Sequence, residues 1–341
     1  MNHKLFLLAL PMAFLASCSN APQETNNGSA DTVETDPLPS WNDTQTKSNI
    51  VSFVENVSNP SHADYVEPKD RIATFDNDGT LWAEQPAYFQ LFFAIDEVKA
   101  MMADHPEWKD QHPYKEVYEN DLKGLAEYGE KGLIQLVLAS HSNMSTDQFA
   151  ENVANWVNTA QHPTKKVKYT DLVYQPMLEL IRYLEANEFT VFIVSGGGID
   201  FMRVFVEEAY GLPTHQVIGS SLKAEFQADG DNFSLVKVGE LDFIDDKEGK
   251  PVAIHKHIGK KPILACGNSD GDLQMMQYAW SNTLPNFQLY IHHTDEEREW
   301  KYDSESHIGR LSKGLEEAEQ KGWTVADMKN DWNTVFNNDS K

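Results

Sequence analysis

A short apolar run ends in two aspartates and a glycine in the stretch Arg71-Ile72-Ala73-Thr74-Phe75-Asp76-Asn77-Asp78-Gly79-Thr80-Leu81-Trp82. The run from Ile72 to Phe75 predicts a buried strand of a parallel sheet. Side chains two positions apart on an extended chain point the same way, so Asp76 and Asp78 leave the strand end together. Two adjacent carboxylates are costly unless a cation or a shared proton offsets them. The pattern indicates a polar site, although an Asp-rich turn is the alternative.

Three further segments with candidate site residues follow along the chain. Two of them are apolar runs that end in polar or glycine-rich residues, and one is the start of a helix. The apolar run 190–194 leads into Ser195-Gly196-Gly197-Gly198, and the run 262–266 leads into Gly267-Asn268-Ser269-Asp270-Gly271-Asp272. Between them, Lys250 lies at the predicted start of a helix, just before Pro251. Lys256, Lys260 and Lys261 are the alternatives for a lysine at this site.

The four segments, in this order, resemble the four motifs of the haloacid dehalogenase (HAD) superfamily of phosphohydrolases, in the phosphoserine-phosphatase-like branch. The resemblance implies that Asp76 is a nucleophile that forms an aspartyl-phosphate. It implies that Asp78 is the general acid and base, and that this second aspartate favours a phosphatase over a dehalogenase. The phosphate-binding groups would be Ser195, Gly196, Gly197 and Lys250.

The same resemblance implies a Mg²⁺ cofactor, held by Asp76, the Asp78 carbonyl, Asn268 and Asp272. Asn268 departs from the family, which usually has an aspartate there. An amide oxygen can still bind Mg²⁺, but the site loses one negative charge, so we expect weaker metal binding, with Asp270 compensating through a water. On this interpretation Asn268→Asp tightens metal binding.

The N-terminus has the features of an export signal. Lys4 precedes an apolar run of residues 5–15, which is too short to span a bilayer. The ending Leu15-Ala16-Ser17-Cys18 resembles a bacterial lipobox, which implies a signal peptide of residues 1–18 and lipidation of Cys18. An ordinary cleaved signal peptide is the alternative.

Residues 19–48 are polar and predict a flexible tether, since such a composition buries too little apolar surface to fold. Ser19 after the lipobox implies, by resemblance, the outer membrane. We therefore expect a lipid-anchored protein of the cell envelope that faces the periplasm.

The remaining sequence predicts an α/β fold. Apolar residues recur every three or four positions across residues 83–186, which predicts an inserted helical cap. Residues 49–82 and 187–341 would form the catalytic core. Strands alternating with helices, with polar motifs at strand ends, predict a doubly wound, Rossmann-like parallel sheet, the HAD fold. Short β-like pieces between residues 220 and 249 surround a turn at residues 229–232.

Charge and cysteine content limit the partners. The chain has 53 acidic and 28 basic residues, a net charge of −25, which disfavours nucleic acid and anionic membrane surfaces. The lipid anchor is then the only expected membrane contact, and attraction of a phosphate must be local. Cys266 is the only cysteine besides Cys18, so the mature domain has no internal disulfide. The oligomeric state stays open.

The function implied by the resemblance is Mg²⁺-dependent hydrolysis of a small phosphorylated metabolite outside the cytoplasm. Two alternatives stay open: a catalytically weak binding lipoprotein with this fold, and a phosphotransferase with an acceptor other than water. In the phosphoserine-phosphatase-like branch, a carboxylate shortly after the first motif meets the substrate amine. Glu84 and Gln85 lie in that neighbourhood here. Trp82 and Tyr88 are expected to be packing residues rather than substrate contacts.

Overall fold

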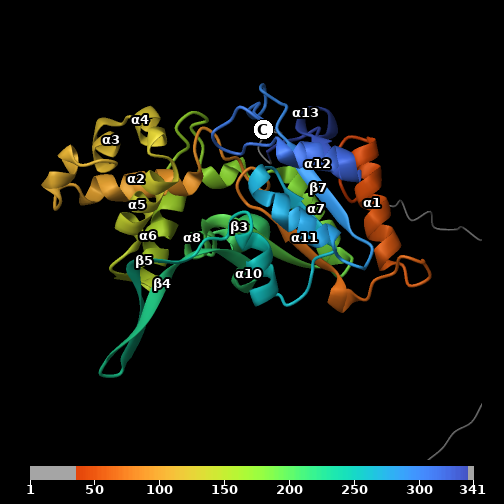
Figure 1. Cartoon of the computed structure of the whole chain (residues 1–341), viewed down its shortest axis with the longest axis horizontal. Helices are drawn as coiled ribbons and strands as arrows, with labels where there is room; N and C mark the ends of the chain where they lie inside the picture. Colours follow the sequence, from red (N-terminus) through yellow and green to blue (C-terminus); the bar gives the residue numbers. More distant parts are fainter. Residues whose placement is uncertain (1–35, 337–341) are drawn as a thin grey trace, which may run out of the picture. The chain divides into compact units, whose positions relative to one another are not determined.

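A computed structural model describes residues 36–336, which are built around one sheet (Figure 1). Its eight strands lie in the order β2-β5-β4-β3-β1-β6-β7-β8. All pairs from β4 to β8 in this order are parallel. These strands are β1 (Ile72–Phe75), β3 (Thr190–Gly198), β4 (Val217–Asp229), β6 (Leu264–Gly267), β7 (Phe287–His292) and β8 (Thr324–Asp327). The predicted α/β fold with a parallel sheet is confirmed.

Alternate residues of the strands enter two separate hydrophobic clusters, one on each face of the sheet. Phe75 and Ile193 pack with residues of α1, α7, α8 and α9, whereas Val194 and Ala265 pack with residues of α10, α11 and α12. Two covered faces explain why these strands are apolar on both sides. The helices are α1 (Gln45–Ser58), α7 (Gln175–Ala186), α8 (Ile199–Met202), α9 (Val206–Tyr210), α10 (Gly249–His257), α11 (Leu273–Trp280), α12 (Lys313–Lys321) and α13 (Met328–Asp331).

The helical insert after β1, here called the cap, has a small core of its own. The cap comprises α2 (Phe89–Met101), α3 (Tyr114–Glu119), α4 (Leu122–Glu127), α5 (Gly129–His141) and α6 (Thr146–Thr159), which lie together in Figure 1. The strand β2 (Met144–Ser145) joins it to the sheet by pairing with β5 (Asn232–Phe243). The antiparallel hairpin β4–β5 projects from the sheet, and its turn falls at the predicted residues.

The cap is shorter than the predicted 83–186, because α7 belongs to the core. This helix packs on β3, since a parallel β1–β3 pair requires a crossover helix against the sheet. Helical periodicity alone does not distinguish a crossover helix from a cap helix.

The predicted tether 19–48 also ends early. Leu38 and Trp41 are buried, and the Trp41 ring meets the edge of Trp332 at 5.7 Å. Backbone and hydroxyl of Ser40 both donate to the carboxylate of Glu179. A few apolar residues within a polar segment are enough to dock it on α7. Residues 1–35, which include Cys18, lie outside the described part of the chain.

None of the helices within residues 36–336 has the length and apolar content needed to cross a bilayer.

Candidate active site

The four predicted motifs meet at one edge of the sheet. β3, β1 and β6 are parallel neighbours, so their carboxyl ends bring together Ser195, Asp76 and Asn268. α10 adds Lys250 from its first turn. Gly249 permits this approach, because a Cβ there would lie 2.2 Å from the Ile244 carbonyl oxygen.

The side chain of Lys250 is held by three hydrogen bonds from its Nζ. Its Nζ donates to Asp76 Oδ1 at 2.6 Å, Asp272 Oδ1 at 2.7 Å and the Val194 carbonyl at 2.8 Å. Burial by itself would lower the pKa of Lys250, but Asp272, Asp76 and Asp245 raise it above its ordinary value. The lysine is therefore a fixed positive charge beside the predicted nucleophile. This geometry favours Lys250 over Lys256, Lys260 and Lys261 for the site.

The two aspartates of the first motif have raised pKa values. Burial, with a contribution from Asp272, raises the pKa of Asp76 to about 8, against the opposing effect of Lys250. Burial raises the pKa of Asp78 to about 6, opposed by a hydrogen bond from Trp82 Nε1 at 2.8 Å. Carboxylates crowded in this way are the environment in which a bound cation restores charge balance.

A tight turn holds the first motif against the fourth. Gly79 has φ of +71°, and a Cβ there would lie 2.0 Å from Asn268 Nδ2. The turn is closed by Leu81 N donating to the Asn77 carbonyl at 2.8 Å. Only glycine satisfies both the left-handed backbone and the close contact.

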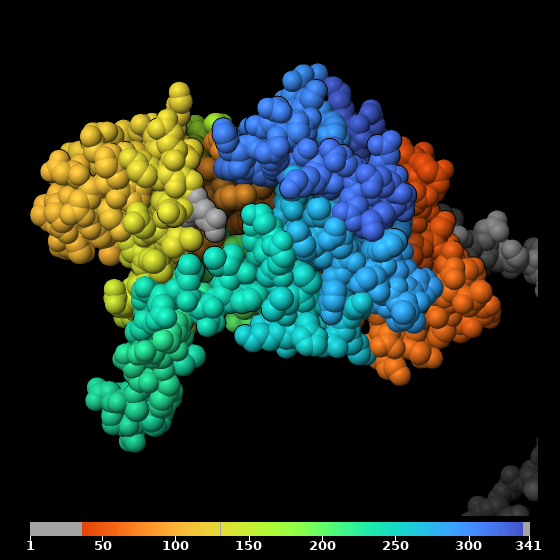
Figure 2. Space-filling view, in the orientation of Figure 1, coloured from red at the N-terminus to blue at the C-terminus, as the bar shows by residue number. Residues whose placement is uncertain are grey.

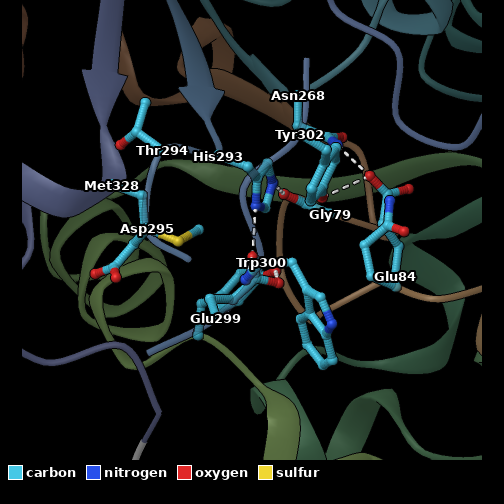
Figure 3. A network of polar contacts seen from close by, with 12 residues as sticks. Gly79, Glu84, Asn268, His293, Thr294, Asp295, Glu299, Trp300, Tyr302 and Met328 are labelled. Carbon is cyan, nitrogen blue, oxygen red and sulfur yellow. Dashed lines mark hydrogen bonds and ion pairs between the residues drawn. The ribbon is translucent and has the colours of Figure 1, made fainter. Parts of the chain in front are cut away.

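Asn268 lies in a buried polar network (Figure 3). Its Oδ1 accepts from Thr80 Oγ1 at 3.1 Å, and its Nδ2 donates to Glu84 Oε1 at 2.7 Å. Tyr302 Oη donates to the same Glu84 oxygen at 2.8 Å. Burial raises the pKa of Glu84 well above its ordinary value, and Asp78 and Asp76 add to the effect. Glu84 therefore faces Asn268 and Tyr302, which was not anticipated.

A second part of this network supports the backbone of the first motif. His293 Nε2 donates to the Gly79 carbonyl at 2.7 Å, and its Nδ1 lies 3.1 Å from Glu299 Oε2 (Figure 3). Tyr174 Oη donates to the other Glu299 oxygen at 2.8 Å. This arrangement fixes the backbone of the turn at Gly79.

The two acidic residues of the fourth motif have different roles. Asp272 Oδ2 accepts from the backbone N–H groups of Asn268 and Ser269, each at 3.0 Å, while Oδ1 accepts from Lys250. Asp272 thus orders the loop and orients Lys250. Asp270 Oδ1 accepts from the backbone of Ser312 and Gly314, each at 2.9 Å. Through these bonds Asp270 anchors the start of α12. This differs from its predicted role, which was to compensate at the metal site through a water.

The second motif forms the opposite side of the site. Ser195 is buried, and its Oγ accepts from Gly197 N at 3.1 Å. A Cβ on Gly197 would lie 3.5 Å from Asp78 Oδ2, so this backbone borders Asp78 of the first motif. Gly196 is exposed at the same bend. Pairing with β4 shifts register between Ser195 and Gly198, which releases these groups from the sheet.

One cap residue reaches this motif. Gln90 Oε1 accepts from Gly198 N at 2.7 Å, so its Nε2 faces His141 Nε2 at 3.0 Å and donates to it. Burial, aided by Lys237, lowers the pKa of His141 to about 3, consistent with a neutral acceptor. Sequence reasoning missed Gln90 and His141, because neither belongs to a motif.

Asp245 was also missed. It is fully buried, and burial raises its pKa to about 7 against the opposing effect of Lys250. Its backbone N–H donates to Ser220 Oγ at 2.9 Å. The only sequence signal was an acidic pair shortly before Lys250.

Trp82 is a packing residue, as expected, with Phe205 stacked on it at 4.5 Å between ring centroids. Tyr88 is only half-buried and borders the cavity described below. Gln85 Nε2 donates to the Ile308 carbonyl at 3.2 Å.

The oxygen donors suit Mg²⁺ by their chemistry. The candidates are the Asp76 carboxylate, the Asp78 backbone carbonyl and Asn268 Oδ1, all hard ligands at one edge of the sheet. Within residues 36–336, no three His, Cys, Asp or Glu side chains are grouped to hold a metal ion. Any metal here would therefore depend on the carbonyl and amide oxygens.

A cavity of about 750 Å³ opens above these groups, between the cap and the core. Asp76, Asp78, Ser195 and Lys250 line its floor. Figure 2 shows the surface hollowed between cap residues in yellow and core residues in teal and blue. Asp76 and Asp78 therefore lie together at the floor of a cavity that is open to a ligand.

The comparison with solved structures finds similar folds at low identity. A conserved protein of unknown function from Anaerococcus prevotii is 16% identical, with a TM-score of 0.49, covering 86% of this chain and 94% of that one. One from Bordetella pertussis is 15% identical, with a TM-score of 0.46 and coverage of 76% and 98%. A phosphoserine phosphohydrolase-like protein from Francisella tularensis is 16% identical, with a TM-score of 0.37 and coverage of 74% and 99%.

No curated protein sequence matches. The sequence profile of the haloacid dehalogenase-like hydrolases matches residues 73–277, more than half of the chain and all four motifs. The chain belongs to the family of haloacid dehalogenase-like hydrolases.

Proposed function

We propose that the protein is a Mg²⁺-dependent hydrolase of a small phosphorylated metabolite, acting through an aspartyl-phosphate on Asp76. One observation carries the proposal: Lys250 bonds Asp76 at 2.6 Å, beside Asp78, on the floor of a cavity open to a substrate. Hydrolysis of phosphate monoesters is among the slowest uncatalysed reactions, so it requires a nucleophile, an acid and charge neutralisation together.

The residues divide the reaction into two displacements. In the first, a carboxylate oxygen of Asp76 attacks phosphorus, the bond to the ester oxygen breaks, and Asp78 donates its proton to the leaving alkoxide. In the second, Asp78 takes a proton from water, whose oxygen attacks phosphorus and breaks the bond to Asp76. A pKa of about 6 for Asp78 suits a group that donates and then accepts a proton near neutral pH.

Three groups are proposed to bind the phosphoryl oxygens. Lys250 supplies a fixed positive charge, Ser195 Oγ can donate its proton, and the bend at Gly196 and Gly197 brings backbone N–H groups close. The raised pKa of Asp76 supports a site designed for an additional cation.

Asp76, the Asp78 carbonyl and Asn268 would hold Mg²⁺, with Asp272 beside them as the fourth predicted residue. When bound, Mg²⁺ offsets the charge on the transferring phosphoryl group.

The test is a panel of small phosphomonoesters, assayed with Mg²⁺ and with EDTA. We expect hydrolysis with Mg²⁺ and its loss in EDTA, restored by added Mg²⁺. Binding without turnover would favour the weak binding protein, and phosphoryl transfer to added alcohols in preference to water would favour the phosphotransferase.

Asp76→Asn is expected to lower kcat by a factor on the order of 1,000 or more, because the amide is a poor nucleophile. Thermal unfolding should show a folded variant, since the two side chains are nearly isosteric. Turnover near the wild-type rate would exclude Asp76 as the nucleophile.

We propose further that the protein is exported and lipid-anchored through Cys18 in the cell envelope, at the outer membrane facing the periplasm. The apolar run and lipobox-like ending support this. Cys18→Ser should move the protein from the membrane fraction to the soluble periplasmic fraction. A variant that stays in the membrane fraction after high-salt washing would contradict the anchor.

A further inference from the structure

The cavity above the catalytic aspartates is much larger than the phosphoryl site. Its volume of about 750 Å³ lies in the upper part of the range for sites that enclose drug-sized ligands. Asp76, Asp78, Ser195 and Lys250 line only the floor of this cavity. The remaining wall is therefore the surface that meets the organic part of a substrate.

On the cap side this wall is apolar. Leu122 of α4 and Leu133, Ile134 and Val137 of α5 line the cavity. Leu122 remains 43% exposed, and the three side chains of α5 are only partly buried. Apolar side chains left partly open around a cavity gain free energy when an apolar ligand covers them.

The facing wall is apolar as well. Ile199 at the start of α8 lines the cavity, with Leu241 of β5 and Ile244 just after it. Ile244 is 42% exposed. Apolar side chains thus line the cavity from α4 and α5 of the cap and from α8 and the end of β5.

The buried polar groups in this wall already have partners. Lys237 is 3% exposed, forms an ion pair with Asp200 and lies 4.7 Å from the Phe149 ring centroid. Gln90 and His141 are bonded to each other. The exposed residues Lys123 and Lys247 also line the cavity. The wall therefore combines an apolar interior with a polar rim, and its buried polar groups are bonded within the protein.

We propose that this cavity binds an apolar organic group, so that the substrates are phosphomonoesters whose leaving alcohol carries an alkyl or aryl moiety. The proposal rests on the proposed phosphatase function and specifies its substrate class. The phosphate lies on the polar floor, and the apolar group occupies the space between α5 and the residues after β5. A compact polar substrate such as O-phosphoserine would leave those walls uncovered.

The direct test compares kcat/KM for ethyl, butyl, hexyl and octyl phosphate, with O-phosphoserine as the polar comparator, using the Mg²⁺-loaded protein. We expect kcat/KM to rise about two- to four-fold per added methylene until the chain fills the cavity. A flat or falling series, or a preference for O-phosphoserine over butyl phosphate, would overturn the proposal.

Two cavity variants test the location. Leu133→Gln makes the α5 wall polar, and Ala126→Trp fills the space from α4. Each should lower the octyl-to-ethyl ratio of kcat/KM at least five-fold. Leu235→Gln is the matched control, since Leu235 is 48% exposed on β5 and does not line the cavity. An equal loss in the control and in both cavity variants would place the apolar preference elsewhere.

A binding experiment separates this proposal from the proposed function. Titration calorimetry of the Mg²⁺-loaded protein with octylphosphonate and ethylphosphonate requires no turnover. Tighter binding of octylphosphonate, reduced by Leu133→Gln, supports the cavity even if no phosphomonoester is hydrolysed. Hydrolysis of the panel together with equal affinity for the two phosphonates would retain the phosphatase and reject the apolar cavity.

Discussion

At the scale of single residues, the contact between Asn268 and Glu84 explains the departure from the family. Asn268 Nδ2 donates to Glu84 Oε1 at 2.7 Å, and both side chains are buried. An aspartate at position 268 would instead bring two carboxylates together. Glu84 thus places a carboxyl group beside the position at which the resemblance to the family implies an aspartate. This neighbour opposes the tighter metal binding that the sequence predicts for Asn268→Asp.

We therefore expect Asn268→Asp to lower the free energy of unfolding in EDTA by about 1–3 kcal/mol, because the hydrogen bond from Nδ2 to Glu84 is lost and a second acidic group enters a buried site where the pKa of Glu84 is already raised. The double variant Glu84→Gln with Asn268→Asp restores a hydrogen bond between the two positions and should recover most of that loss. Urea unfolding in EDTA measures the stability, and titration calorimetry measures whether Mg²⁺ affinity recovers in parallel.

Asn232→Asp, on the exposed hairpin turn, is the control for adding a negative charge. The effects of the substitutions at positions 84 and 268 on the free energy of unfolding could instead be additive. The absence of a coupling energy would exclude a direct interaction between these two side chains.

At the scale of elements, the segment before α1 is part of the core. Trp41 is 1% exposed, meets Trp332 edge to face and donates from Nε1 to the Pro176 carbonyl at 3.0 Å. Ser40 binds Glu179 on α7, so this segment and the crossover helix stabilise each other. The polar composition concealed this role, because only a few side chains of the segment, Leu38 and Trp41 among them, are apolar and buried.

Trp41→Ala should lower the free energy of unfolding by about 3–5 kcal/mol, the usual cost of truncating a buried aromatic residue. Trp280→Ala is the matched control. Its side chain is 46% exposed, so we expect a loss of about 1 kcal/mol or less. Urea unfolding monitored by circular dichroism compares the two. Equal losses would contradict the assignment of Trp41 to the core.

At the scale of the whole molecule, the charge of −25 and several buried acids make stability depend on pH. Burial raises the pKa of Asp245 to about 7 from an ordinary value of 3.8. As pH rises through this interval, the unfolded chain loses the proton while the folded protein keeps it. Ionisation therefore favours the unfolded state, and this part of the stability falls between pH 4 and pH 7.

Asp245→Asn removes this effect. Relative to wild type, it should gain about 2 kcal/mol more stability at pH 8 than at pH 5, measured by urea unfolding in EDTA. Asp231→Asn, at an exposed position in the hairpin turn, should show no such pH dependence. A constant difference between Asp245→Asn and wild type across this range would show that Asp245 is not perturbed.

Local patterns were sufficient for much of the fold and site. Each motif follows a short apolar strand or starts a helix, so Asp76, Ser195 and Asn268 were identified as candidate site residues from their immediate neighbours. Because the carboxyl ends of parallel strands share one edge, their convergence followed from the predicted sheet.

The tertiary structure alone decided the features that depend on contacts between distant segments. Glu84 and Asn268 are 184 positions apart, and the cavity walls come from α4, α5, α8 and the end of β5. Likewise, α7 has the same periodicity whether it covers the cap or the sheet. Periodicity records that a side chain is buried, whereas the identity of its partner is set by how the whole chain packs.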